Sequence, residues 1–214
     1  YEVTPRYWVP KREVLNRIAD VPDSVRKVWY AGEEHELRMA LATCGDKELQ
    51  QLAAADNLMK KMDQVMDRRS PKWLMGWRDI TNTTNERTVI ASVFPRGGVG
   101  NTINMILGVH DKDKFFLIGN LTSIVLDYCA RQKVGGTHLN QFYFKQLPIL
   151  QPVKVNKNPI VLINQYVGEL VSTTHRMAST FSEAVSSWDE GRRAELRAEL
   201  DALFARLYGL NREE

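Results

Sequence analysis

Three stretches of the sequence combine side chains that are suited to contacts with a nucleic-acid duplex. They cover residues 68–79, residues 81–87 and residues 131–138, and they are rich in Arg, Lys, Asn, Gln and Thr. Phosphates are contacted by Arg, Lys, hydroxyl groups and exposed backbone N–H groups. Base edges are read by Arg at guanine and by Asn or Gln at adenine. These residue types are therefore suited to a duplex, and by themselves they indicate a domain with a basic face of polar loops.

From these stretches we take ten candidate DNA-binding residues: Arg78, Asn82, Thr83, Arg87, Arg131, Lys133, Gly135, Gly136, Thr137 and His138. Each stretch also has a structural interpretation. Arg78 could form an ion pair with the adjacent Asp79, and Asn82 and Thr83 could stabilise turns. Lys133 could be a solvated residue that offsets the dipole at a helix C-terminus. The residue types alone leave both interpretations open.

The common catalytic motifs are absent from this sequence. Residues 95–102 are glycine-rich but lack the Gly-Lys-Ser/Thr of a phosphate loop. The four histidines, at positions 35, 110, 138 and 175, lack metal-ligand spacing. There is no Gly-x-Ser-x-Gly, residues 158–161 do not form an Asn-Pro-Pro-Tyr tetrad, and no acid-x-Lys cluster suggests a nuclease. We expect no catalytic residue, metal site or cofactor site in this chain.

The charge is unevenly distributed along the chain. The net charge is only +3 and the isoelectric point is near 8.8. Residues 60–100 contain eight Lys or Arg against four acids, and residues 111–158 contain seven against three, whereas the tail from residue 183 is net acidic. A basic middle region is typical of proteins with an anionic partner, although solvated surface charge produces the same pattern.

The two cysteines, Cys44 and Cys129, have neither metal-ligand nor disulfide-framework spacing. We expect both to be small buried residues in a reducing, cytoplasmic setting. No apolar run approaches the roughly 20 residues that span a bilayer, so we expect no membrane partner. Because the sequence begins at Tyr1 and ends in a charged tail, we interpret it as a fragment of a longer protein.

The N-terminal part is predicted to be extended over residues 1–10 and helical afterwards. Pro10 suits the first turn of a helix. Apolar spacing predicts helices over residues 23–69, with breaks at Gly32 and at Gly45-Asp46. Residues 47–67 are predicted as one helix whose apolar stripe packs in a core or against another helix. The alternative is that this stripe is a groove for a partner.

The apolar period changes after Pro71. Short apolar runs at residues 72–80, 86–94 and 103–109, separated by turn-forming residues, predict a small sheet. Residues 114–131 are predicted to form one buried helix, because apolar residues nearly encircle it, and Gly135-Gly136 caps it about one turn late. A short strand or helix over residues 139–150 is ended by Pro148.

Two further helices are predicted, over residues 161–187 and 189–208, with Gly209 as the C-terminal stop. The expected fold class is α/β, in the mixed α+β sense: a small central sheet with a buried helix, flanked by N-terminal and C-terminal helices. We expect three regions in one compact fragment. They are residues 1–70 (extended segment and helical insert), 71–151 (α/β core) and 152–214 (C-terminal helices).

Several motifs resemble those of one protein family. They are WLMGWRDI (residues 73–80), NERTVIA (85–91), ARQKVGGTHL (130–139), LPI (147–149) and the tail SSWDEGRRAELRAELDALFARLYGL (186–210). Together with residues 5–7, they resemble the C-terminal target recognition region of large adenine-specific DNA methyltransferases. Such enzymes occur in type IIG-like restriction-modification and phage-defence systems. An Asn-Ser pair of the family pattern is here spread over Asn120 to Ser123, and residues 23–69 match only as generic helix.

The resemblance implies a bacterial or archaeal DNA recognition domain that gives sequence specificity and is not catalytic by itself. It implies a separate catalytic domain in the same polypeptide, which would hold S-adenosylmethionine and the flipped adenine. It places phosphate contacts at Arg131, Lys133 and residues 135–138, and leaves base reading open between residues 81–85, residues 96–101 and the helical insert. The alternative function is a scaffolding module that docks on other domains of the parent enzyme through its helices at 47–67 and 189–208.

Overall fold

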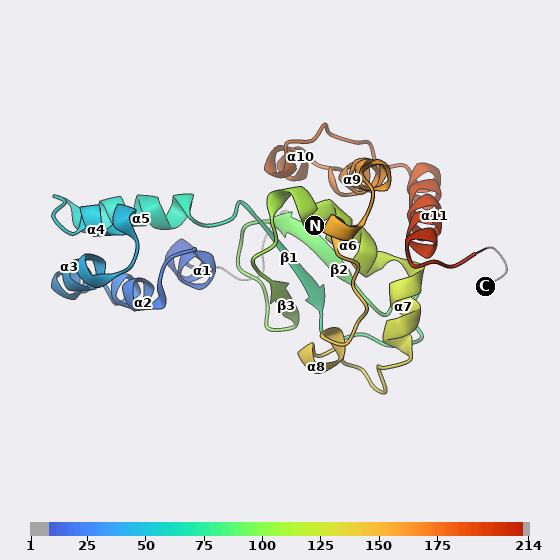
Figure 1. Ribbon diagram of the computed structural model, residues 1–214, viewed down its shortest axis with the longest axis horizontal. Coiled ribbons are helices and arrows are strands. Elements are labelled where there is room, and N and C mark those ends of the chain that lie inside the picture. The colour runs from blue at the N-terminus through green and yellow to red at the C-terminus, as the bar shows by residue number, and fades with distance from the viewer. Residues whose placement is uncertain (1–8, 212–214) are drawn as a thin grey trace. The chain divides into compact units, whose positions relative to one another are not determined.

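The computed structural model describes residues 9–211 (Figure 1). Most of the predicted extended segment, and the family resemblance at residues 5–7, lie outside the described residues. The described chain divides into two compact units. The first contains residues 9–72 and 96–98, and the second contains residues 73–95 and 99–211. The division after residue 72 lies close to the predicted limit at residue 70. The C-terminal helices belong to the same unit as the sheet.

The first unit is a helical bundle built from α1 (Lys11–Ile18), α2 (Asp23–Ala31), α3 (Glu34–Thr43), α4 (Lys47–Leu52) and α5 (Leu58–Arg68). Both predicted breaks are confirmed. Gly32 ends α2 in the left-handed region, at φ 89°, where only glycine is free of strain. The Asp46 carboxylate caps α4 by accepting the Glu48 and Leu49 N–H groups.

The single helix predicted over residues 47–67 is wrong, because α4 ends at Leu52 and α5 begins at Leu58. Asn57 adopts a left-handed conformation, at φ 54°, which a helix interior does not contain. The apolar stripe of this region nevertheless packs in the core of the unit. Its fully buried members are Leu49, Leu58, Met62 and Met66.

The second unit is organised around a three-stranded antiparallel sheet in the order β2-β1-β3. Its strands are β1 (Trp73–Arg78), β2 (Ala91–Pro95) and β3 (Ile103–Ile106). Met75 of the central strand lies opposite Val93 on one side and Ile106 on the other. Gly76 is required by packing, since a Cβ there would lie 2.5 Å from the Asn104 carbonyl oxygen. The predicted mixed class with a small sheet is confirmed.

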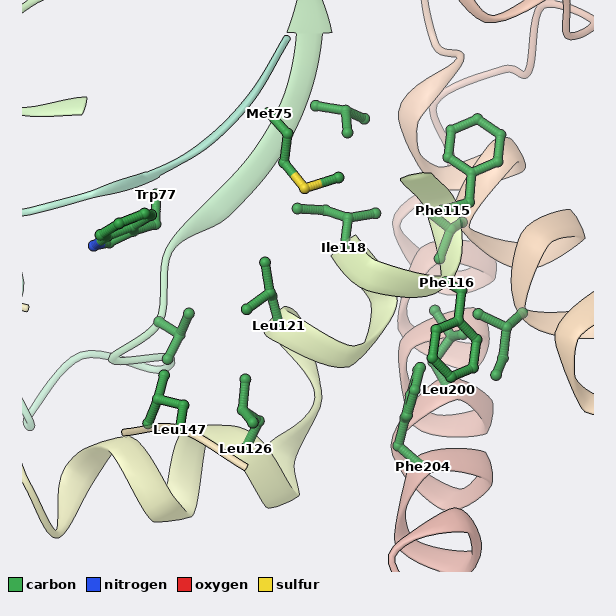
Figure 2. Close-up of a cluster of buried hydrophobic side chains, with 14 of the residues drawn as sticks. Met75, Trp77, Phe115, Phe116, Ile118, Leu121, Leu126, Leu147, Leu200 and Phe204 are labelled. Atoms are coloured by element: carbon green, nitrogen blue, oxygen red, sulfur yellow. The ribbon is translucent and has the colours of Figure 1, made fainter. Parts of the chain in front are cut away.

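The buried helix predicted over residues 114–131 is two helices, α6 (Lys114–Thr122) and α7 (Ile124–Arg131). Ser123 breaks the run with an extended ψ of 149°, and its hydroxyl accepts the Leu126 N–H to cap α7. The predicted burial is confirmed for α6, whose Phe116 and Leu121 are fully buried. In Figure 2, Ile118 of α6 lies beside Met75 of the sheet.

The C-terminal part contains α8 (Gln141–Phe144), α9 (Lys157–Val171), α10 (His175–Phe181) and α11 (Glu190–Leu207), and short 3-10 turns lie at Asp111–Asp113 and Pro152–Lys154. The one helix predicted over residues 161–187 is wrong: α9 ends at Val171, and Thr174 caps α10 by accepting the Met177 N–H. Asp189 begins α11 as an N-cap, and Gly209 ends it at φ 84°.

The C-terminal helix packs on the core of the sheet unit. Phe116 of α6 meets Phe204 of α11 edge-on, at 5.6 Å between ring centroids, and Leu200 lies beside them (Figure 2). Asn120 of α6 accepts the Leu150 N–H at 2.9 Å and donates to the Tyr208 hydroxyl at 2.9 Å. That hydroxyl donates to the Pro148 carbonyl at 2.6 Å. The LPI segment is therefore tied to both helices by a polar network around the buried Asn120 side chain.

Candidate nucleic-acid interface

Two of the three predicted stretches meet at the C-terminal end of β1. Thr81 N–H donates to the Thr137 carbonyl at 2.9 Å, and Leu139 N–H donates to the Asp79 carbonyl at 2.8 Å. Ile80 and His138 form the antiparallel bridge between these bonds. Residues 79–81 and 137–139 thus form a short ladder beyond the end of β1, a pairing that the sequence did not predict.

The polar loop, residues 81–88, is closed by its own hydrogen bonds. The buried Thr81 hydroxyl donates to the Thr88 carbonyl at 2.6 Å. Asn82 Oδ1 accepts the Thr84 N–H at 3.0 Å, and Asn85 Nδ2 donates to the Thr81 hydroxyl at 3.3 Å. Asn82 therefore stabilises a turn, as its structural interpretation held. The predicted DNA contacts of Asn82 and Thr83 stay predictions.

A buried carboxylate holds this loop to α7. Asp127 is only 1% exposed, and its Oδ1 accepts the Thr88 and Val89 N–H groups at 2.6 and 2.9 Å. Its Oδ2 accepts Arg131 Nε at 2.7 Å. A carboxylate at this depth is stable because its lone pairs and its charge are both satisfied.

Arg131 completes the clamp from the other side of the loop. Its Nη1 donates to the Thr83 carbonyl, and its Nη2 donates to the Asn85 and Glu86 carbonyls at 2.7 and 2.8 Å. The guanidinium therefore bridges one carboxylate and three loop carbonyls, and Asp127 offsets its charge. The phosphate contact predicted for Arg131 stays a prediction, but this geometry assigns the side chain to holding the loop.

Arg87 and Glu86 attach the far end of the loop to α11. Arg87 Nη2 lies 2.6 Å from Asp201 Oδ2, and Asp201 Oδ1 accepts the Ile124 N–H at 2.7 Å. Glu86 forms an ion pair with Arg197. Arg87 is thus paired with a carboxylate, and its predicted DNA contact also stays a prediction.

Arg78 is left without the partner considered for it. The Asp79 carboxylate lies 2.8 Å from His138 Nδ1. No hydrogen bond or ion pair joins the Arg78 side chain to any residue between 9 and 211, and the side chain is exposed at the end of β1. Arg78 is therefore an uncompensated cation at the edge where the loop and the ladder meet.

The glycine turn, residues 133–138, presents unpaired backbone donors. The N–H groups of Gly135, Gly136, Thr137 and His138 donate no hydrogen bond within the described residues, and all four residues are exposed. Neither glycine has a positive φ, and a Cβ at either would meet no atom within 4 Å. The helix-capping role predicted for this pair is wrong, because residues 133 and 134 already close the helix by donating to the Ala130 carbonyl.

The surroundings of the glycine turn are basic. Residues 128–168 include five Lys or Arg and no Asp or Glu. Within residues 9–211, the Lys133 ammonium hydrogen-bonds only to the Gln146 amide oxygen, at 3.4 Å, and Lys145 is exposed. A run of free N–H groups beside uncompensated cations is chemically suited to anionic oxygens.

The other two arginines of the first predicted stretch, Arg68 and Arg69, have a different environment from Arg78. Arg69 pairs with Asp46 and Glu48, and Arg68 pairs with Glu48, all in the helical unit. Hydrogen bonds from Arg69, followed by the Leu49 N–H, lower the pKa of Asp46 to about 2. Arg96, from the glycine-rich loop, lies 2.8 Å from Asp67. Unlike Arg78, these side chains are neutralised within the fold.

The helix α8 was not singled out from the sequence as a site, yet it borders the glycine turn. Asn140 caps it by accepting the Tyr143 N–H at 3.1 Å. Phe144 stacks on Trp77 of β1, with centroids 3.7 Å apart and planes 5° from parallel. Phe142 is 70% exposed. The sequence contained a signal for this exposed ring, because Phe142 and Phe144 lie two residues apart and cannot both face one core from a short helix.

A cavity of about 440 Å³ lies elsewhere in this unit, between β2, α6, α9 and α11. Its walls are mainly aliphatic. Of its charged groups, Arg87 pairs with Asp201, and Arg193 donates to the Leu170 carbonyl and stacks on Trp188. Residues 9–211 contain no cluster of three or more His, Cys, Asp or Glu that could hold a metal. Arg197, which also lines the cavity, forms an ion pair with Glu86.

Comparison with protein families, with curated proteins and with solved structures gave no match. Within the described residues, no helix is both long and apolar enough to cross a membrane. Both cysteines are free thiols; Cys44 is buried, as expected, and Cys129 is only partly buried. Function must therefore be argued from the chemistry of the residues themselves.

Proposed function

We propose that this chain is a recognition domain for double-stranded DNA that is not catalytic by itself. In this proposal it gives sequence specificity to an adenine-specific DNA methyltransferase of a restriction-modification or phage-defence system. The observation that carries the proposal is the glycine turn: four consecutive free N–H groups lie beside Lys133 in a segment without acidic residues. Backbone N–H groups and Lys together form a phosphate contact.

The rest of the edge supports the same assignment. Arg78 supplies an uncompensated guanidinium at the end of β1. The clamp of Asp127 and Arg131 gives the polar loop a fixed shape, and a pre-shaped loop on a rigid sheet can present Asn and Thr side chains to base edges. The sequence resemblance to target recognition regions points to the same partner. It also proposes a catalytic domain elsewhere in the polypeptide that binds S-adenosylmethionine.

The test is duplex binding by the 214-residue chain, followed by fluorescence anisotropy of a labelled 20-base-pair DNA. Because each neutralised phosphate contributes about 0.9 to the slope of log affinity against log salt, the double change Arg78→Ala with Lys133→Ala should make the slope shallower by about 1.8. The matched control is Lys112→Ala. Trp73 Nε1 donates to Asp111 at 2.7 Å, so residue 112 follows a residue that is held at the opposite end of β1 from Arg78, and that strand is about 17 Å long.

Two outcomes contradict the proposal. One is an equal loss of affinity in the control and in the double variant, which would show that general charge rather than this edge binds DNA. The other is an absence of duplex binding at about 50 mM salt, combined with tight binding to the separately expressed catalytic part of the parent protein. That result would favour the scaffolding function.

A further inference from the structure

Phe142 is the most exposed aromatic side chain among residues 9–211, at 70%. It lies on α8, beside the glycine turn and the end of β1 (Figure 1). A large apolar ring that stays in water does not gain the favourable free energy of burial. Either the residue type at position 142 has no role, or a partner covers the ring.

The ring is carried by a rigid support. Phe144 stacks on Trp77, and Trp77 Nε1 donates to the Leu139 carbonyl at 2.8 Å, so Trp77 holds the chain on both sides of Phe142. Gln146 Nε2 donates to the Phe142 carbonyl at 3.2 Å. The Tyr143 ring meets the Phe142 ring edge-on at 5.6 Å. Phe142 thus projects from a fixed backbone, which lowers the entropy lost when it binds.

The surroundings indicate which partner covers the ring. Gln146, which holds the Phe142 carbonyl, also accepts from Lys133, and Lys145 is exposed in the same segment. No acidic residue occurs from 128 to 168. A ring beside Lys133 and Lys145 matches a surface that combines π-faces with negative charge, and the Asp79 carboxylate near the same turn already contacts His138. Stacked bases between phosphates have that composition.

We propose that Phe142 is a wedge that inserts against a base step of the duplex while the glycine turn holds the neighbouring phosphate. This inference rests on the proposed function and adds a mode of recognition to it. Apolar wedges unstack a base step and bend the duplex. Because the free energy of this deformation depends on the base sequence, the wedge would contribute to recognition at positions that no polar side chain contacts.

The experiment compares two 20-base-pair duplexes, one fully paired and one with a single central mismatch. A mismatch lowers the free energy of unstacking, so the wild-type chain should bind the mismatched duplex more tightly. Phe142→Ala should weaken binding to the paired duplex by about thirtyfold, the middle of the range for a stacked base, and should remove the mismatch preference. Phe142→Trp should retain both properties, because the indole also stacks.

Lys133→Ala is the matched comparison, since losing a phosphate contact weakens binding to both duplexes by the same factor. The melting temperature should be unchanged in Phe142→Ala, because the removed ring is exposed. The wedge is contradicted if Phe142→Ala keeps the wild-type mismatch preference, even when its overall affinity falls. If the wild-type chain does not bind duplex DNA, the proposed function is contradicted, and the wedge with it.

Discussion

Replacing Arg131 by Ala separates the two interpretations of this residue. In the structure its guanidinium donates to Asp127 and to three carbonyls of the polar loop. Removing it leaves the Asp127 carboxylate buried with two N–H donors and no cation. If the clamp describes the role of Arg131, the change destabilises the sheet unit. If Arg131 mainly contacts phosphate, the fold should tolerate its loss.

The magnitude follows from the burial of the pair. Removing one partner of a buried ion pair costs about 3 to 5 kcal/mol. Because Arg131 is 31% exposed, solvent screening favours the lower end, about 3 kcal/mol. For a domain of this size, the loss corresponds to a melting temperature lower by about 9 °C. Arg131→Lys should also destabilise the unit, because an ammonium group cannot reproduce the planar fork that joins four acceptors.

The assay is thermal unfolding of each variant beside its salt-dependent duplex binding. Arg78→Ala is the matched control. It removes the same side chain from an exposed site without partners, so the melting temperature should stay within about 1 °C while the salt slope becomes shallower by about 0.9. The reasoning is refuted if Arg131→Ala has the melting temperature of the wild type and its slope of log affinity against log salt is shallower by about 0.9. Arg131 would then be a phosphate ligand.

Two further predictions concern the glycine turn and the helical unit. Changing Gly135 and Gly136 to Ala should leave stability unchanged or raise it by about 0.5 kcal/mol each, since a Cβ meets nothing there. It should weaken duplex binding, because the methyl groups obstruct a phosphate at the N–H groups; unaltered binding in anisotropy would contradict this. Because Arg69 lowers the pKa of Asp46 from 3.8 to about 2, unfolding in urea should show stability that is present above pH 3.8 and lost as the pH falls towards 2. Arg69→Ala should flatten this dependence, and an unchanged pH profile would argue against the pair.

The sheet and most of the helices were predictable because their apolar spacing and caps are local signals. Gly32, Asp189 and Gly209 each end or begin a helix through their own backbone preference or side chain. The missed breaks at Ser123 and near Asn57 interrupt runs that stay apolar on both sides. Periodicity cannot register a change of direction between two buried helices.

The candidate site was predictable by residue type and not by arrangement. The sequence identified the residues at 78, 131 and 133–138 as polar and basic, but Arg131 and Arg78 have the same chemistry and opposite environments. The ion pair that neutralises Arg131 is local, since Asp127 lies four residues before it on α7. The contact that ties Asp127 to the polar loop joins residues 39 apart in the chain. Such long-range pairing carries no local sequence signal, and this also explains why the ladder between Ile80 and His138 was not foreseen.

Amide hydrogen exchange of Gly135, Gly136, Thr137 and His138, measured by NMR with and without a 20-base-pair duplex, tests the central claim most directly. These N–H groups have no acceptor within residues 9–211, so they should exchange fast in the free protein. The account predicts that they slow when DNA is bound at about 50 mM salt and recover their fast exchange at about 200 mM, as phosphate contacts are lost. The account is contradicted if the chain binds the duplex while these four amides exchange at their free rates.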